Sequence, residues 1–317
     1  DIGGTNVRGR AFSTGALFSI VLAHIDVTYD ELQVLSRSGS ADPVLAVSLL
    51  LDHIKAKNHQ LSDISHVVLA VAGRTDSTGI STSIGNRGVR VDIRCVEHVL
   101  LTAGCSPKIF VINDFEAAAW GVSCMQRCDR RIIVCPAERS RFQGDTRRAI
   151  VCGPGTGLGV SCIVSSPQDK AKIVVIPSEA GNTTFAPESD HEFEFLGENR
   201  DLVRTYEDVL SARGLSALFS WHRLKAGTSH ELNSSPESVC RLACEGDLLA
   251  QEAVRTFCRI LGAFCGNQVL NFTCNEGVFL WGGVLQGIPD AMIKVPFSEG
   301  YFSRPRYAEF VASVPVF

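Results

Sequence analysis

Apolar and polar positions alternate along the first third of the chain in blocks that predict helices and strands in turn. Residues 41–57 (ADPVLAVSLLLDHIKAK) carry apolar residues at helical spacing. Asp42 is a residue type that caps helices, and Pro43 favours the first helical turn. HVVLAVAG at 66–73 predicts a strand, as does KIFVIND at 108–114, which the helical sequence FEAAAWGVSCM follows. Because strands and helices alternate, we expect a parallel or mixed sheet covered by helices.

The pattern changes after this point, which predicts a domain boundary near residue 112. AIVCGPGTGLGVSCIV predicts two strands joined by a glycine turn, and KIVVIPSEAGNTTFAP predicts another strand that runs into a polar loop. Helical patterns dominate 200–275, and GVFLWGG predicts a last strand. We therefore expect a small α/β domain at 1–112 and a large α/β domain at 113–317.

Composition and charge exclude several classes of partner. The 317 residues are 45% apolar and 20% charged with a net charge of −4, which is typical of a globular enzyme and predicts no nucleic-acid partner. The apolar runs are far shorter than the roughly 20 residues of a membrane span, so no membrane partner is expected. The 12 cysteines lie in apolar runs, which indicates core thiols in a reducing compartment. The chain opens on Asp1 without a methionine or a preceding strand, so we interpret it as a fragment.

The opening sequence DIGGTN combines residue types that can bind phosphate. Gly3 and Gly4 would let backbone amides approach phosphate oxygens, and Thr5 and Asn6 add donors. Asp1 supplies a carboxylate suited to Mg²⁺. Taken alone, the stretch is more typical of an ordinary hairpin turn.

GPGTGLG at 153–159 repeats this device between two apolar strands, with Gly155, Thr156, Gly157 and Gly159. It is not a Walker A loop, because no Lys-Ser/Thr follows, and it is not the dinucleotide fingerprint, because a strand follows. Alone it is typical of a structural turn. Two such turns in one chain favour a clamp on a polyphosphate.

A third glycine-bearing strand end, Gly282 and Gly283, could admit a nucleoside, although a plain strand-to-helix turn is the alternative. Asn113 and Asp114 stand where a strand meets a helix, which is where α/β proteins place site residues. The carboxylate could accept a proton from a substrate hydroxyl that the amide positions. The alternative is that Asp114 only caps the helix.

Two further carboxylates could each hold a pair of sugar hydroxyls. Glu179 lies in the polar loop PSEAGN, and Glu207 lies at a helix start in TYEDVLSARGL. Either one alone is more typical of a solvated surface acid.

Taken together, these motifs resemble the bacterial-type glucokinase family of the actin/hexokinase/Hsp70 ATPase superfamily. The matches follow the family's order over residues 1–284: DIGGTN, VAG…GN, INDFEAAAWG, GPGTGLGV, PSEAGNTTFAP, EDVLSARGL and VFLWGGV. The resemblance implies a two-lobed actin-like ATPase fold (ribonuclease H-like), with mixed sheets flanked by helices and an active-site cleft between the lobes. It also implies transfer of the γ-phosphate of ATP, with Mg²⁺, to the 6-hydroxyl of glucose.

The resemblance assigns roles to the candidate residues. Asp114 is the general base, and the turns at 1–6 and 153–159 hold phosphates, with Gly282–Gly283 near the nucleoside. The residues that hold the sugar are Asn113, Glu179, Glu207 and, less directly, Asn86. The family resemblance further suggests a homodimer active in glycolysis. We expect a cytoplasmic location, with a peroxisome-like organelle such as a glycosome as the alternative, because both are reducing compartments.

The chain departs from the family pattern at two places near the sugar site. Asn182 stands where the family usually has His, and Arg74 follows Gly73 where the family usually has Gly-Pro. An amide can still hydrogen-bond a hydroxyl, so Asn182 remains a candidate sugar residue. The alternatives are a kinase for another hexose, and a non-catalytic or assembly-forming relative of actin or Hsp70.

Overall fold

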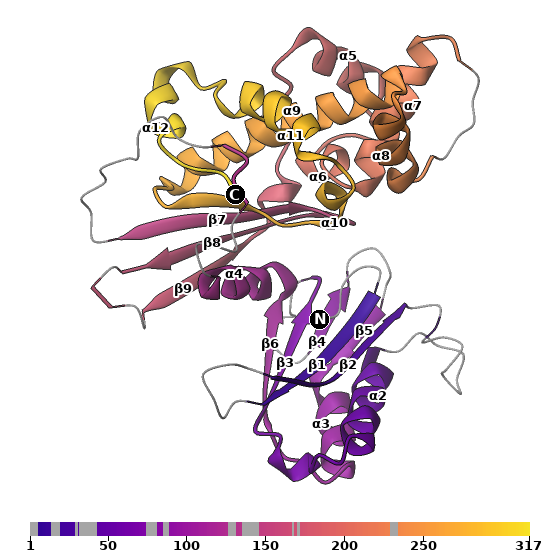
Figure 1. The fold of residues 1–317 in the computed structure, drawn as a ribbon, viewed down its shortest axis with the longest axis vertical. Helices are drawn as coiled ribbons and strands as arrows, with labels where there is room; N and C mark the ends of the chain where they lie inside the picture. Colours follow the sequence, from indigo (N-terminus) through magenta and orange to yellow (C-terminus); the bar gives the residue numbers. More distant parts are fainter. Residues whose placement is uncertain are drawn as a thin grey trace. The chain divides into compact units, whose positions relative to one another are not determined.

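The computed structural model describes residues 6–13, 20–28, 31, 43–73, 81–84, 89–125, 131–134, 146–166, 168–169, 172–228 and 234–317. The chain forms two compact units, Asp1–Ala117 and Ala118–Phe317 (Figure 1). Both contain β-structure and helices, as the alternating pattern predicts. Among the described residues, no helix combines the length and the apolar character needed to cross a membrane.

The first unit is built around two parallel strands, β3 (His66–Val71) and β6 (Lys108–Asn113). Alternate residues of these strands pack with α2 (Pro43–Ala56) and α3 (Ile93–Thr102) in one apolar cluster. The unit also contains β1 (Asn6–Ser13) antiparallel to β2 (Ile20–Thr28), β4 (Ser81–Ile84) antiparallel to β5 (Val89–Asp92), and the 3₁₀ turn η1 (Leu61–Asp63). The predicted helix and both predicted strands are therefore present, and α4 (Asp114–Cys124) begins directly after β6.

The second unit contains a four-stranded sheet in the order β10-β7-β8-β9. β7 (Arg147–Pro154) and β8 (Leu158–Ser165) form the predicted hairpin, and β9 (Ile173–Ser178) is antiparallel to β8. β10 (Gly277–Leu280) is parallel to β7. β7, β8 and β10 are largely buried, and helices cover the sheet face that carries Ile150 and Val160, whereas β9 keeps Val174 and Ile176 exposed.

The helices of the second unit surround one long, largely buried helix, α9 (Leu248–Phe272). The other elements are η4 (Ala180–Asn182), α5 (Asp190–Glu198), α6 (Tyr206–Val209), α7 (Ala212–Lys225), α8 (Pro236–Glu245), α10 (Gly283–Gln286), α11 (Asp290–Tyr301), η5 (Pro305–Tyr307) and α12 (Ala308–Ala312).

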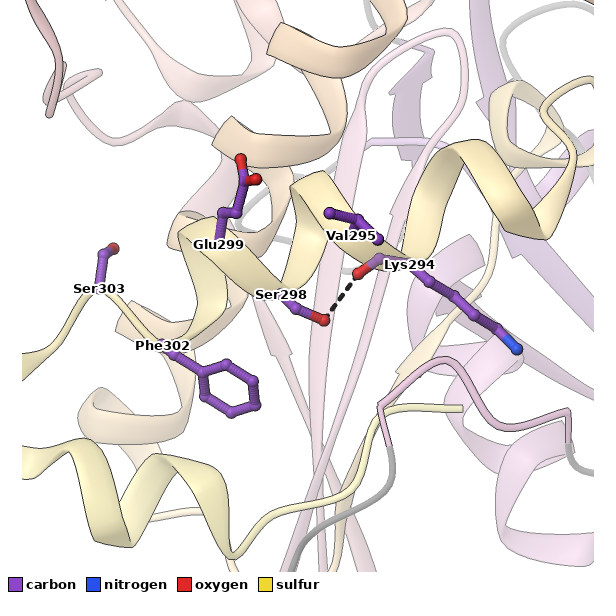
Figure 2. A pocket seen from close by; sticks show the side chains of 6 residues that line it. All are labelled: Lys294, Val295, Ser298, Glu299, Phe302 and Ser303. Atoms are coloured by element: carbon purple, nitrogen blue, oxygen red, sulfur yellow. Dashed lines mark hydrogen bonds between the residues drawn. The ribbon is translucent and has the colours of Figure 1, made fainter.

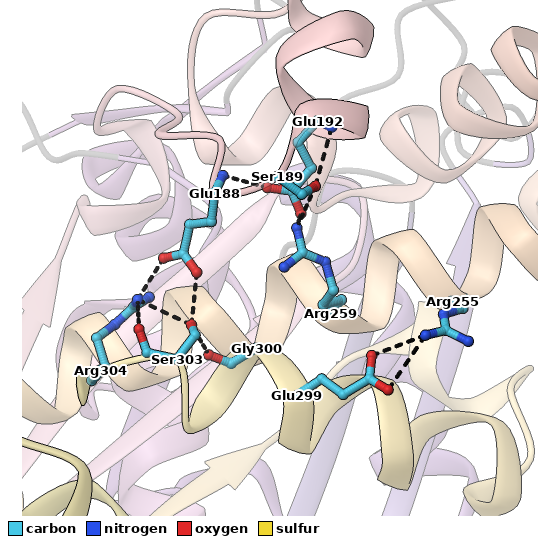
Figure 3. Close-up of polar contacts among 9 residues, drawn as sticks. All are labelled: Glu188, Ser189, Glu192, Arg255, Arg259, Glu299, Gly300, Ser303 and Arg304. Atoms are coloured by element: carbon cyan, nitrogen blue, oxygen red, sulfur yellow. Dashed lines mark hydrogen bonds and ion pairs between the residues drawn. The ribbon is translucent and has the colours of Figure 1, made fainter.

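Ion pairs connect α5, α9 and the end of α11 (Figure 3). Glu192, whose side chain is 3% exposed, pairs with Arg259, and Glu188 pairs with Arg304 at 2.5 Å. Burial raises the pKa of Glu192, although the hydrogen bond from the Glu188 amide and the positive charge of Arg259 act to lower it. A buried carboxylate of this kind depends on its partners, because removal of one partner leaves an uncompensated charge.

Candidate functional site

The glycine turn predicted to bind phosphate connects β7 to β8. The turn follows Pro154, and the Gly155 amide donates to the Gly157 carbonyl at 2.8 Å. Because β7 and β10 are parallel, both of their carboxyl ends lie at one edge of the sheet, which is where α/β sheets bind ligands. The Gly155 amide stabilises the turn itself, and Gly159 lies within β8 opposite Gly153.

The glycines predicted to lie near the nucleoside adjoin this turn. A Cβ atom on Gly282 would lie 2.2 Å from the Pro154 carbonyl oxygen, so only glycine permits this contact. The Trp281 amide donates to the Cys152 carbonyl at 2.8 Å, and the Trp281 side chain is 53% exposed. Gly283 begins α10, which confirms the strand-to-helix turn. The phosphate and nucleoside segments predicted from sequence are therefore neighbours.

Glu207 contacts the same turn from α6. Its Oε2 accepts a hydrogen bond from the Leu158 amide at 3.0 Å. A Cβ atom on Gly157 would lie 2.5 Å from that oxygen, so the glycine makes room for the carboxylate. The Ala212 amide also donates to the Gly155 carbonyl at 2.8 Å. The corner between α6 and α7 therefore supports the turn.

Local sequence fixes α6 in this position. Thr205 caps the helix and forms a reciprocal capping box with Asp208. Nη2 of Arg213 lies 2.6 Å from Oδ1 of Asp208 and 3.9 Å from Oε1 of Glu207. Burial opposes the charge of Asp208, but hydrogen bonds from Thr205 and the Arg204 amide, with the Arg213 charge, hold its pKa below the usual value. Asp208 therefore stays ionised and anchors both the helix and the arginine.

The predicted sugar loop meets the turn from β9. The Asn182 amide nitrogen donates to Oε2 of Glu179 at 3.4 Å. A Cβ atom on Gly181 would lie 2.1 Å from the Leu158 carbonyl oxygen, so the loop packs directly on that peptide group. A short antiparallel bridge between Thr184 and Thr205 joins the loop to the start of α6.

Three predicted segments therefore converge on one residue that the sequence did not single out. Leu158 donates its amide to Glu207, receives Gly181 against its carbonyl, and ends the turn at 155–157. We call residues 155–158, 179–182 and 207–213 the Leu158 corner.

In the first unit, Asn113 and Asp114 mark the end of β6 and the start of α4. The Asn113 Oδ1 accepts hydrogen bonds from the amides of Phe115 at 2.9 Å and Glu116 at 3.2 Å. The Asn113 Nδ2 lies 3.5 Å from the Gly73 carbonyl. Asp114 also accepts from the Phe115 amide at 2.9 Å. The capping contacts expected as the alternative for Asp114 are therefore shared with Asn113.

Several predicted site residues lie outside the described residues: Asp1, Gly3, Gly4, Thr5 and Asn86, together with Arg74. Asn6 begins β1, and only its backbone is described. Within the described ranges, no group of three or more His, Cys, Asp or Glu side chains could hold a metal ion.

Sequence reasoning missed three residues at this edge: Leu158, Arg213 and Trp281. The signal that the sequence offers for Trp281 is its place between the last predicted strand and the glycine pair Gly282–Gly283. Arg213 follows two acids in EDVLSARGL, which suggests an ion pair. The role of Leu158 is carried by its backbone, so its side chain gives no signal.

A shallow surface hollow lies on α11, away from all of these segments in sequence (Figure 2). Its lining comprises Lys294, Val295, Ser298, Glu299, Phe302 and Ser303. None of the predicted site residues contributes to it, so it adds nothing to the candidate site.

Comparison with known proteins gives one consistent result. The family model described as Glucokinase matches residues 1–317. A glucokinase of Marinobacter nauticus is 30% identical over the whole chain and 90% of its own length. The chain also matches bifunctional proteins of Burkholderia pseudomallei and its relatives, spanning 45% of their length.

Solved structures agree on the fold. The glucokinase of Balamuthia mandrillaris, solved with glucose, is 20% identical with a TM-score of 0.78, covering 99% of this chain and 87% of that one. A ROK-family glucokinase of Streptomyces griseus, solved with glucose and AMPPNP, is 18% identical with a TM-score of 0.61, covering 97% and 88%. The predicted actin-like ATPase fold, mixed α/β with helices flanking sheets, is confirmed.

Proposed function

The chain belongs to the glucokinase family of enzymes, and on that basis we propose that it transfers the γ-phosphate of ATP to the 6-hydroxyl of glucose. The observation that carries the proposal is the Leu158 corner. The segments expected to bind phosphate and those expected to bind sugar lie in separate parts of the sequence, and they meet at one residue, Leu158.

The proposed phosphate site consists of the turn at 155–157 with Gly159, and of the opening segment that contains Gly3, Gly4, Thr5 and Asn6. Glycines suit this role because backbone amides can approach phosphate oxygens closely. Gly282 and Gly283 are proposed to contact the nucleoside. Asp1 is proposed to hold Mg²⁺, which would neutralise phosphate charge when bound.

The proposed sugar site uses side chains whose acceptors suit hydroxyl groups. Glu179 has one hydrogen-bond partner among the described residues, Asn182, which leaves acceptor capacity for a sugar. Oε1 of Glu207 lies 3.9 Å from the Arg213 guanidinium and keeps acceptor capacity for a sugar hydroxyl. Asn113 and Asn86 are proposed to contact further hydroxyls.

Asp114 is proposed as the general base. Its carboxylate accepts the proton of the 6-hydroxyl as that oxygen bonds to the γ-phosphorus, and the bond from the γ-phosphorus to the β-phosphate oxygen breaks to release ADP. Phosphoryl transfer depends mainly on positioning and charge neutralisation, so a set of donors, one base and Mg²⁺ would suffice.

We further propose that the unit Asp1–Ala117 corresponds to the small domain and the unit Ala118–Phe317 to the large domain. The proposed assembly is a homodimer, on the basis of the family resemblance, and the proposed compartment is the cytoplasm.

A coupled assay for glucose 6-phosphate and ADP, with Mg²⁺ and ATP present, tests the proposed reaction. We expect ADP release that depends on glucose. A protein that is folded by circular dichroism but releases no ADP in response to glucose would refute the proposal.

A further inference from the structure

We propose that Glu207 is a positioning residue for the phosphate turn as well as a sugar ligand, so that sugar and nucleotide share one carboxylate and bind cooperatively. This inference rests on the proposed function for the sugar, but its nucleotide part can be tested with no sugar present.

The first observation is the contact between the carboxylate and the turn. Oε2 of Glu207 accepts the Leu158 amide at 3.0 Å, and the missing side chain of Gly157 provides the space for that oxygen. A hydrogen bond to a charged acceptor is stronger than one between neutral groups. The carboxylate therefore holds the backbone at the exit of the turn that the nucleotide phosphates are proposed to contact.

The second observation is that the same side chain remains accessible. The Glu207 side chain is 24% exposed, and its other oxygen, Oε1, lies 3.9 Å from the Arg213 guanidinium. Arg213 pairs more closely with Asp208, at 2.6 Å. One oxygen of Glu207 is therefore committed to the turn, while the other keeps acceptor capacity for a sugar hydroxyl.

The third observation is that the sugar loop contacts the same residue, Leu158. Gly181 packs against the Leu158 carbonyl, while Glu207 binds the Leu158 amide. The sugar loop and Glu207 therefore both contact the residue that ends the phosphate turn.

These contacts predict positive coupling between the two ligands. A sugar hydroxyl bound to Oε1 would immobilise the Glu207 side chain, and the nucleotide would then meet a turn that is already ordered. Coupling is reciprocal, so nucleotide should tighten sugar binding by the same factor. We expect that factor to be about 5-fold or more.

Glu207→Ala, Glu207→Gln and Glu179→Ala separate this role from sugar binding. Calorimetric titration with Mg·ADP in the absence of sugar should show about 10-fold weaker binding for Glu207→Ala, because the Leu158 amide loses a charged acceptor. Glu207→Gln retains an acceptor and should restore most of that affinity. Glu179→Ala is the matched control, since Glu179 makes no hydrogen bond to the turn among the described residues, and it should bind Mg·ADP like the wild type.

Gly157→Ala provides a test that leaves Glu207 in place. Its Cβ atom would displace the carboxylate oxygen from the Leu158 amide, so it should weaken Mg·ADP binding as Glu207→Ala does. Circular dichroism and melting curves identify any variant that fails to fold. Because residue 157 also belongs to the proposed phosphate turn, Gly157→Ala supports the positioning role only together with Glu207→Ala.

Equal Mg·ADP affinity for Glu207→Ala, Gly157→Ala and Glu179→Ala without sugar would overturn the proposal. A wild type that binds no Mg·ADP would overturn it as well. If Glu207→Ala weakens Mg·ADP binding but the wild type binds no glucose, the positioning role stands and the proposed sugar substrate fails.

Discussion

Glu207 in the Leu158 corner and Glu192 on α5, among the helices that surround α9 (the helical layer), both lie near an arginine, yet their surroundings differ. The Glu192 side chain is 3% exposed and is paired with Arg259, with the Glu188 amide as an additional donor. The Glu207 side chain is 24% exposed and contacts a backbone amide, and its arginine lies 3.9 Å away.

This difference separates a carboxylate that serves stability from one that can serve a ligand. A carboxylate surrounded by its own partners has little capacity left for a substrate, and its loss leaves a charge unpaired. A carboxylate that holds one amide and still meets solvent can accept another hydrogen bond. We therefore expect changes in the helical layer to alter unfolding and changes at the site to alter binding or turnover.

The largest expected effect extends the comparison to Asp114 in the other unit. Asp114→Asn should lower kcat by about 10³-fold, because the amide cannot accept the proton of the sugar hydroxyl. Glucose affinity should change little, since the side-chain shape is kept. Steady-state kinetics with equilibrium glucose binding checks this split. Glu116→Gln, a carboxylate in the first turn of the same helix, is the matched control. A kcat near that of the wild type in Asp114→Asn would remove the proposed base.

The second prediction concerns the helical layer. Glu192→Ala should destabilise the protein by about 3 kcal/mol, because it leaves Arg259 without its buried partner. Replacing both residues with methionine should recover most of that loss. Urea unfolding measures both, and glucose affinity of the folded variants should match the wild type. If Glu192→Ala lowered glucose affinity and left urea unfolding unchanged, Glu192 would serve the ligand rather than stability, contrary to this account.

The third prediction uses His222, a buried residue of α7. Burial, with the charges of His191 and Lys225, lowers the pKa of His222 to about 4, and its Nε2 has no hydrogen-bond partner in the described part of the chain. The unfolded state therefore binds the proton first as the pH falls, so this contribution to stability is complete above about pH 6.5 and is lost towards pH 4.

The loss should amount to about 2–3 kcal/mol across that window. Unfolding curves recorded between pH 7 and pH 4 measure it, and His222→Gln should flatten the dependence. An equally steep dependence in His222→Gln would assign it to other groups.

The smallest expected effect concerns Asn182 in the Leu158 corner. Asn182→His, which restores the residue usual in the family, should lower the KM for glucose by about 3-fold through a better hydrogen bond to the sugar. Parallel assays with mannose, fructose and glucosamine should show a narrower preference for glucose. An unchanged ranking of these four sugars would indicate that residue 182 does not select the sugar.

The sequence allowed the local elements to be predicted, because each depends on residues close together in the chain. The helix that begins at Pro43, the hairpin around Gly155 to Gly157, and the strand-to-helix junction at Asn113 all follow from such signals. The order of the motifs indicated the fold family.

The contacts that build the candidate site could not be predicted from these signals. Leu158 and Glu207 are 49 residues apart, and their hydrogen bond depends on how α6 packs on the hairpin. The pairing of Glu192 with Arg259, 67 residues away, is equally hidden, because an acid in a polar segment gives no sign that it will be buried. Asn113 had a sugar role by resemblance, while its part in capping α4 became visible only in three dimensions.

The stabilisation of the protein by glucose tests the central claim most directly. At a glucose concentration 100 times its Kd, the wild type should gain about 2.7 kcal/mol of stability and melt at a clearly higher temperature. Glu179→Ala should show a much smaller shift at the same concentration, while Glu237→Ala, which removes an exposed carboxylate of α8, should match the wild type. Equal shifts in all three proteins would contradict the placement of the sugar site at the Leu158 corner.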